Sequence, residues 1–135
     1  MKIEHVALWT YKLEEMKEFY VKYFGGKSNE KYVSAHEFKA EFSSYFISFD
    51  SGCRLELMQM DTIPDGSNKK GFESTGFTHI AFEVAEKREV DDIVKRLKAD
   101  GITITGEPRM TGDGYYEAVL LDPDGNCVEI TVTPE

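Results

Sequence analysis

A duplication limits what this chain can fold into more than any other feature of its sequence. The segment Ile3–Leu8 is echoed by Phe77–Phe82, and Gly52–Leu57 is echoed by Gly125–Ile130. His79 therefore follows its counterpart in the first copy by 74 positions. Because the period is long and occurs only twice, it indicates one structural module present in two copies, and not a solenoid of short units.

The first copy predicts a helix flanked by strands. Alternating apolar residues favour a strand around Glu4–Thr10, and Leu13–Phe24 carries apolar residues at helical spacing before Gly25 and Gly26 end it. Three further strands are expected near Glu30–Ser34, Phe42–Phe49 and Arg54–Met60. The polar, turn-rich segment 61–76 is predicted to be a linker.

The second copy repeats this order. The pattern predicts strands at Thr78–Val84, Ile102–Thr105, Tyr116–Leu121 and Cys127–Thr133, and a helix at Val90–Ala99 capped by Gly101. Each half is therefore β-α-β-β-β, with module one at about 1–60 and module two at about 77–133 of a single domain, 1–135. One such sheet leaves a face uncovered, so an α+β fold is expected in which the two modules pair around a shared concave surface.

Size, charge and cysteine content exclude several classes of function. The chain has 135 residues, enough for one globular domain, and a formal net charge of -9, which leaves no basic surface for nucleic acid. No segment approaches the ~20 apolar residues of a membrane span, and the N-terminus lacks the apolar run of a signal peptide. Two cysteines fit a reducing compartment, so a cytoplasmic protein without a membrane partner is expected.

The residues that coincide under the duplication are good ligands for a divalent transition metal. They are two histidines and two glutamates, namely His5, Glu56, His79 and Glu129. Small residues beside each histidine, Ala7 and Ala81, leave room for an ion and a ligand. Two imidazoles and two carboxylates suit Ni²⁺, Co²⁺, Zn²⁺, Mn²⁺ or Fe²⁺, and they leave coordination positions for water or substrate.

The whole chain resembles the vicinal oxygen chelate superfamily, and within it the glyoxalase I-like proteins of the glyoxalase/bleomycin resistance/dioxygenase group. The resemblance is carried by His5–Leu8, Phe19–Gly25, His79–Val84 and the turn Asp122–Asn126 that leads into Val128–Ile130. It implies that paired βαβββ modules form a cupped half-barrel holding one metal ion. The first and last strands of each module would supply the ligands, which again gives the four residues named above.

The ligand set separates branches of that superfamily. Extradiol dioxygenases and fosfomycin-type thiol transferases usually present two histidines and one glutamate, epimerases commonly carry glutamine in place of Glu56, and sequestering binders have generally lost the ligands. The resemblance thus implies a glyoxalase I-like lyase or isomerase, which moves a proton through an enediolate of, for example, a 2-oxoaldehyde–thiol hemithioacetal. Glu129 would be the base and Glu56 its counterpart. An epimerase, a thiol transferase and a binding protein that sequesters a small molecule remain alternatives.

Two departures from the glutathione-using members bear on the substrate. Trp9 and Met60 occupy positions where those members carry a basic residue and an asparagine, so the sequence disfavours glutathione as the thiol. Together with Met58, these residues predict a more apolar small-molecule substrate. Arg54, on the metal face, and Arg109, in the loop 106–114, are the candidates for contact with an anionic group. The resemblance also implies a homodimer.

Overall fold

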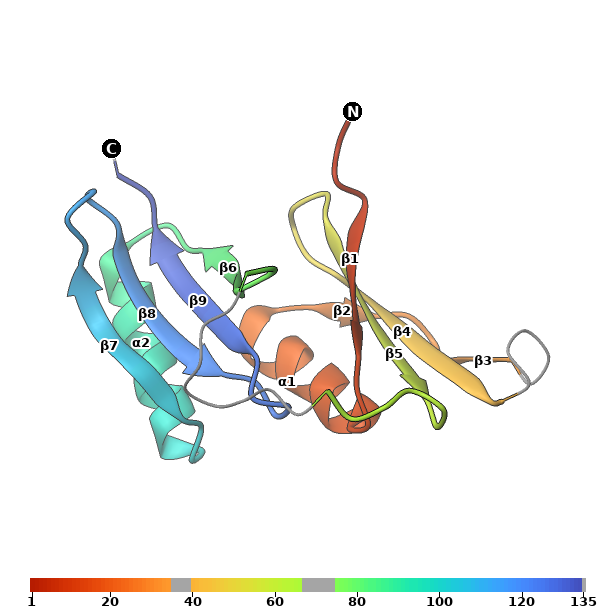
Figure 1. The fold of residues 1–135 in the computed structure, drawn as a ribbon. Coiled ribbons are helices and arrows are strands. Elements are labelled where there is room, and N and C mark those ends of the chain that lie inside the picture. The colour runs from red at the N-terminus through yellow and green to blue at the C-terminus, as the bar shows by residue number, and fades with distance from the viewer. Residues whose placement is uncertain (35–39, 67–74, 135) are drawn as a thin grey trace. The chain divides into compact units, whose positions relative to one another are not determined.

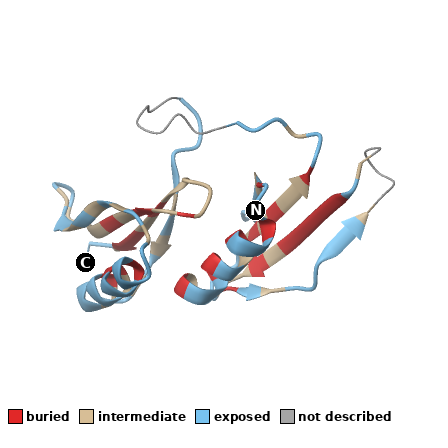
Figure 2. Cartoon of the chain, turned by 90° about the horizontal axis from the view of Figure 1, so that it is seen from below, coloured by how far each residue is buried: buried red, intermediate tan, exposed pale blue. Residues whose placement is uncertain are grey.

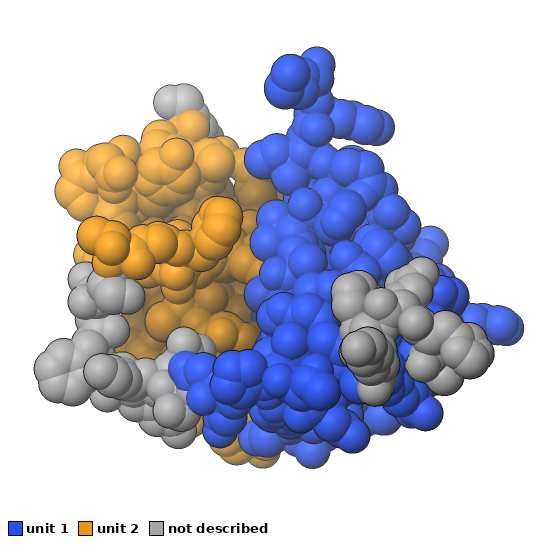
Figure 3. All heavy atoms as spheres, turned by 45° about the vertical axis from the view of Figure 1, so that its right-hand side comes forward, with its two compact units in different colours: residues 1–67 blue, residues 68–135 orange. Residues whose placement is uncertain are grey.

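The structure is a computed structural model that describes residues 1–34, 40–66 and 75–134. The chain divides into two compact units, Met1–Ser67 and Asn68–Glu135, which Figure 3 distinguishes by colour. The division falls within the predicted linker, of which residues 67–74 lie outside the described part. Each unit is described by itself below.

Unit 1 contains the first copy of the repeat. Its elements are β1 (His5–Trp9), α1 (Leu13–Phe24), β2 (Lys27–Ser28), β3 (Tyr32–Ser34), β4 (Phe42–Ser48) and β5 (Arg54–Met60) (Figure 1). The sheet order is β1-β5-β4-β2, with β3 also paired to β4. The first and last strands of the module are parallel neighbours, whereas β4 and β5 form an antiparallel hairpin.

Unit 2 repeats the arrangement with β6 (His79–Glu83), α2 (Lys87–Ala99), β7 (Ile104–Met110), β8 (Tyr116–Leu121) and β9 (Cys127–Val132). The sheet order is β6-β9-β8-β7, and the module's first and last strands are again parallel neighbours. The predicted α+β fold is therefore confirmed, with the order β-α-β-β-β in unit 2 and the same order plus the short β2 in unit 1.

The core of each unit lies between its helix and one face of its sheet (Figure 2). In α1 the buried residues recur at helical spacing, and they are Leu13, Met16, Phe19, Tyr20 and Tyr23. Tyr45 of β4 donates a hydrogen bond to Glu14 of α1, which marks the helix side of the first sheet. Tyr116 of β8 does the same with Asp91 of α2. We call the opposite side of each sheet its ligand face.

The predicted elements differ from the structure at several points. The second strand of module two begins at Ile104, not Ile102, and continues to Met110 through two irregularities of register. Gly106 and Pro108 are typical of a turn, so the sequence pattern ends the strand too early. Both residues are tolerated within β7 because it is an edge strand. Helix α2 begins at Lys87, three residues earlier than predicted. The additional strand β2 has only two residues, too few to show an alternating pattern.

No helix in the described residues is long and apolar enough to cross a membrane.

Candidate functional site

The pairing register places the predicted ligands of each module on its ligand face. In unit 1, Ala7 of β1 is opposite Glu56 of β5, so His5 lies one diagonal step from that glutamate. In unit 2, Ala81 of β6 is opposite Glu129 of β9, which repeats the same offset for His79. Two strands that are parallel and in identical register thus bring together residues about fifty positions apart in sequence.

The two histidine–glutamate pairs have nearly the same geometry. His5 Nε2 is 3.5 Å from Glu56 Oε2, and His79 Nε2 is 3.4 Å from Glu129 Oε2. The exposed fractions also match, at 41% and 16% in the first pair and 41% and 14% in the second. These separations exceed an ordinary hydrogen bond of about 2.7–3.2 Å.

The separation fits two donors of one ion. Donor atoms lie about 2.1 Å from a transition metal, so adjacent ligands are roughly 3.0–3.4 Å apart in octahedral or tetrahedral geometry. Within the described residues no group of three or more candidate ligands occurs, and each unit brings one imidazole close to one carboxylate. This donor chemistry suits a divalent transition metal.

Electrostatics distinguish Glu129. Its burial raises the pKa of the carboxyl above the usual range, and the nearby Glu117 carboxylate, which also shares a hydrogen bond with it, raises the pKa further. The His79 ring opposes that shift, and Asp113 adds a smaller contribution that raises the pKa. A carboxylate whose pKa is raised is a stronger base, as a proton-abstracting role requires.

The predicted substrate residues of unit 1 share the ligand face but differ in exposure. Trp9 is 42% exposed. Its ring is edge-on to the Phe42 ring, with 6.1 Å between the ring centroids. Met58, opposite Trp9, is half-buried, whereas Met60 is buried, with an exposed fraction of only 8%. Whether any of these side chains contacts a substrate stays a prediction.

Both arginines carry ion pairs. Arg54 donates from Nε to Glu4 Oε1 at 2.8 Å, and its guanidinium lies over the Phe46 ring, 4.2 Å from the centroid. Arg109 is not in a loop as predicted but on β7. There it is opposite Glu117, and its Nη2 is 3.6 Å from Glu117 Oε1. The register places this ion pair on the ligand face of unit 2.

Two carboxylates close to the predicted ligands were not predicted from the sequence, namely Glu4 beside His5 and Glu117 beside Glu129. Glu4 was visible as the neighbour of His5, and the structure bonds it to the Nδ1 atom of that ring. The pKa of Glu4 lies below its usual range. The hydrogen bond with His5 is the largest cause, burial opposes the shift, and Arg54 lowers the pKa further. Glu117 could have been found by counting back from the turn at Asp122–Asn126, since alternation puts it on the Glu129 face.

Comparisons with known proteins agree with this architecture. The family model of the Glyoxalase/Bleomycin resistance protein/Dioxygenase superfamily matches residues 2–130. No curated protein matches the chain significantly. Among solved structures, SMU.1112c is 25% identical with a TM-score of 0.75, and the match covers 97% of this chain and 98% of the other.

Two further solved structures show the fold alone, given their lower identity. A lactoylglutathione lyase from Agrobacterium tumefaciens is 23% identical, with a TM-score of 0.64 and coverage of 97% of this chain and 92% of that one. A glyoxalase I mutant from Zea mays is 22% identical, with a TM-score of 0.74, and the match covers 99% of this chain but 45% of that longer one. Since the family model spans nearly the whole sequence, the chain belongs to the Glyoxalase/Bleomycin resistance protein/Dioxygenase superfamily.

Proposed function

We propose that the protein is a metal-dependent, glyoxalase I-like lyase or isomerase that transfers a proton at a carbon next to a carbonyl. The observation that carries the proposal is the repeated histidine–glutamate pair, with separations of 3.5 and 3.4 Å in the two units. Superfamily members typically bind a metal ion, and the superfamily includes enzymes such as glyoxalase I. His5, Glu56, His79 and Glu129 would together hold one divalent ion, with both modules drawn from one chain or from the two chains of a homodimer.

The residues of the ligand faces suit this chemistry. A divalent ion bound there would act as a Lewis acid that stabilises negative charge on two neighbouring substrate oxygens. Glu129 would accept the proton from carbon, because its burial and the neighbouring Glu117 make its carboxylate more basic. Glu56, the symmetric counterpart, would return or accept the proton at the adjacent carbon.

The substrate is inferred to be small and partly apolar. Trp9 and Phe42 place aromatic surface on the ligand face of unit 1, beside the half-buried Met58. An aromatic ring at position 9 cannot pair with a carboxylate of glutathione, which supports a different thiol or a thiol-free substrate. Arg109 remains a candidate contact for an anionic group, provided that the group displaces its ion pair with Glu117.

Metal content tests the first half of the proposal. Elemental analysis of the purified protein should find about one equivalent of a divalent transition metal per four-ligand site, and a His5→Ala, His79→Ala double variant should lose it. A Glu15→Ala variant is a suitable control, because this exposed glutamate lies on α1. Equal and negligible metal in all three proteins, after incubation with Ni²⁺, Co²⁺ and Zn²⁺ in turn, would refute the site.

Turnover tests the second half. Methylglyoxal is offered with glutathione and, separately, with other small thiols, and thioester formation is followed by absorbance. We expect activity with a thiol less charged than glutathione, and a loss of roughly 10²–10⁴-fold in Glu129→Gln with metal retained. Full activity in that variant would refute the assignment of the base. Tight metal binding without turnover of any hemithioacetal would favour a sequestering protein instead.

A further inference from the structure

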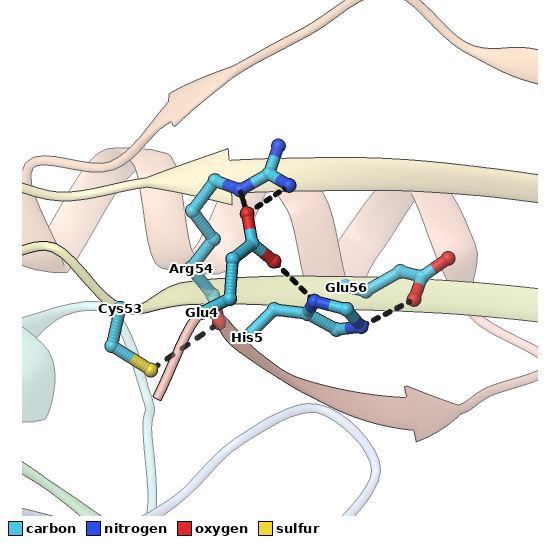
Figure 4. Close-up of polar contacts among 5 residues, drawn as sticks. All are labelled: Glu4, His5, Cys53, Arg54 and Glu56. Carbon is cyan, nitrogen blue, oxygen red and sulfur yellow. Dashed lines mark hydrogen bonds and ion pairs between the residues drawn. The ribbon is translucent and has the colours of Figure 1, made fainter. Parts of the chain in front are cut away.

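A chain of four polar side chains crosses the ligand face of unit 1 at the His5 end. The Arg54 guanidinium donates two hydrogen bonds to one Glu4 oxygen, through Nε and Nη2. The other Glu4 oxygen is bonded to His5 Nδ1, and His5 Nε2 points toward Glu56 (Figure 4). The imidazole is therefore bonded to one carboxylate at Nδ1 and faces a second carboxylate at Nε2.

Backbone and aromatic contacts fix this chain in place. Arg54 and His5 are register partners, and the Arg54 N–H donates to the Glu4 carbonyl at 2.9 Å. Phe46 of β4 lies beneath both side chains, edge-on to the His5 ring at 5.5 Å and under the Arg54 guanidinium. Glu4 thus sits between an anchored cation and an anchored ring.

Unit 2 provides an internal comparison. Thr78 stands before His79 where Glu4 stands before His5, and Cys127 is the register partner of His79 where Arg54 is the partner of His5. In the described part of the chain, the ring of His79 has Glu129 as its polar side-chain partner and no second carboxylate. The carboxylate–guanidinium arrangement is therefore a property of module one and not of the repeat.

We propose that Glu4 is a positioning residue that fixes His5 in the tautomer with hydrogen on Nδ1, and that Arg54 holds Glu4 in place instead of binding a substrate anion. This tautomer leaves the Nε2 lone pair directed toward Glu56, where the ion of the proposed function would bind. A carboxylate that accepts from the distal nitrogen of a ligand histidine also makes that ligand more basic, and removing such a partner weakens metal binding by about 10–100-fold.

Loss of Glu4 is expected to change the orientation and tautomer of His5 and to leave the free energy of unfolding nearly unchanged. Glu4, His5 and Arg54 are each more than a third exposed, and ion pairs at such positions contribute little to stability. The proposal makes one statement about the tautomer of His5 and another about affinity for a metal ion, and only the statement about affinity rests on the proposed function. The tautomer is a property of the metal-free protein and is measured without any ion.

The first measurement is the tautomer of each imidazole in the metal-free protein. Long-range ¹H–¹⁵N spectra at a pH of about 9, where ordinary imidazoles are neutral, separate the two forms. We expect His5 with hydrogen on Nδ1, and a shift toward hydrogen on Nε2 in Glu4→Ala, while His79 is unchanged. Thr78→Ala, the matched change in unit 2, should alter neither ring. Hydrogen on Nε2 of His5 in the wild type would overturn the proposal.

The second measurement is affinity for Co²⁺, by competition with a chromophoric chelator. Glu4→Ala should bind about tenfold more weakly than Glu15→Ala, which removes the same charge from α1. Glu4→Gln should be intermediate, since its amide oxygen still accepts from Nδ1. Equal affinity of Glu4→Ala and Glu15→Ala, with the wild type binding Co²⁺, would overturn the role of Glu4. Absence of Co²⁺ binding in the wild type would instead refute the proposed function, and the tautomer result would still decide the positioning.

Discussion

Gly26 is buried where the chain turns from α1 into β2, and its neighbours leave no room for a side chain. A Cβ atom at this position would be 2.4 Å from Ile47 Cγ2, 3.0 Å from the Tyr20 carbonyl oxygen and 3.2 Å from Phe49 Cε1. Gly26→Ala is therefore a direct test of how tightly the helix and sheet of unit 1 pack at this turn.

The cost follows from these distances. Carbon atoms in contact prefer a separation of about 3.5–4.0 Å, so Ile47 must retreat by roughly 1 Å or more. Ile47 is 0% exposed and packs inside the core, and the Tyr20 carbonyl accepts the Gly26 N–H at 3.2 Å. Overpacking of a rigid core costs about 1–3 kcal/mol, and we expect about 2–3 kcal/mol here. The corresponding drop in Tm is roughly 8–24 °C for a cooperative unit of this size.

Urea unfolding monitored by circular dichroism measures this loss, with two other glycines as controls. Gly25 has open space around its Cβ position but a φ of 66°, so Gly25→Ala should cost about 1–2 kcal/mol from backbone strain alone. Gly52 has open space and no left-handed φ, and Gly52→Ala should stay within about 0.5 kcal/mol of the wild type. If Gly26→Ala were as stable as Gly52→Ala, the close packing of Ile47 against this turn would be refuted.

Three further predictions concern pH, the core and the ligand face. In metal-free protein, Glu129→Gln should become more stable than the wild type as the pH rises through the usual carboxyl range. Burial and Glu117 raise the pKa of Glu129 in the folded state, so ionisation of this carboxyl disfavours folding. Glu14→Gln should behave oppositely, losing stability at neutral pH and matching the wild type in acid. Burial tends to raise the pKa of Glu14, but hydrogen bonds from Lys31, Tyr45 and Lys17 lower it overall. Urea unfolding at several pH values measures the free energy of unfolding of each variant relative to the wild type. The same pH dependence of this difference in both variants would contradict the reasoning. Leu57→Ala, at a core position with 0% exposure, should cost about 2–5 kcal/mol in the same assay, and a loss below about 1 kcal/mol would mean that the core of unit 1 can collapse around the cavity. Trp9, the sole tryptophan of the chain, lies on the ligand face, so saturating Co²⁺ should quench its fluorescence in the wild type and not in His5→Ala, and equal quenching in both would place the ion elsewhere.

Much of the fold was predictable because the repeat and the alternation within strands are written directly in the sequence. Period-two spacing groups Ala7 with His5 on one strand and Met58 with Glu56 on another, and the register of β1 with β5 shows that these groups share one face of the sheet. Strand β7 was cut short because Gly106 and Pro108 resemble a turn. An edge strand needs hydrogen bonds on one side only, and that tolerance is a tertiary property which local pattern does not carry.

The ligand faces were predicted less completely than the strands that carry them. Arg54 was expected to meet a substrate anion, whereas the structure engages it with Glu4, the residue immediately before β1. The strand predicted at Glu4–Thr10 includes Glu4, but alternation assigns this residue to the face opposite His5, and only the structure shows its carboxylate bonded to the His5 ring. Glu117 was overlooked since a glutamate on a mixed strand usually faces solvent, and only the β8–β9 register shows its proximity to Glu129.

The parallel pairing of β1 with β5, and of β6 with β9, has a consequence for how the protein is made. Each histidine enters at the start of its module and each glutamate only at the end, so neither pair can form until a loop of about fifty residues has closed. During synthesis a module would therefore acquire both of its proposed ligands only with its last strand, after its helix has already become possible. Under the proposed function, ion binding by the growing chain would report that a module is complete. A polypeptide truncated before Cys127 would contain α1, α2 and three of the four proposed ligands, but it would lack Glu129.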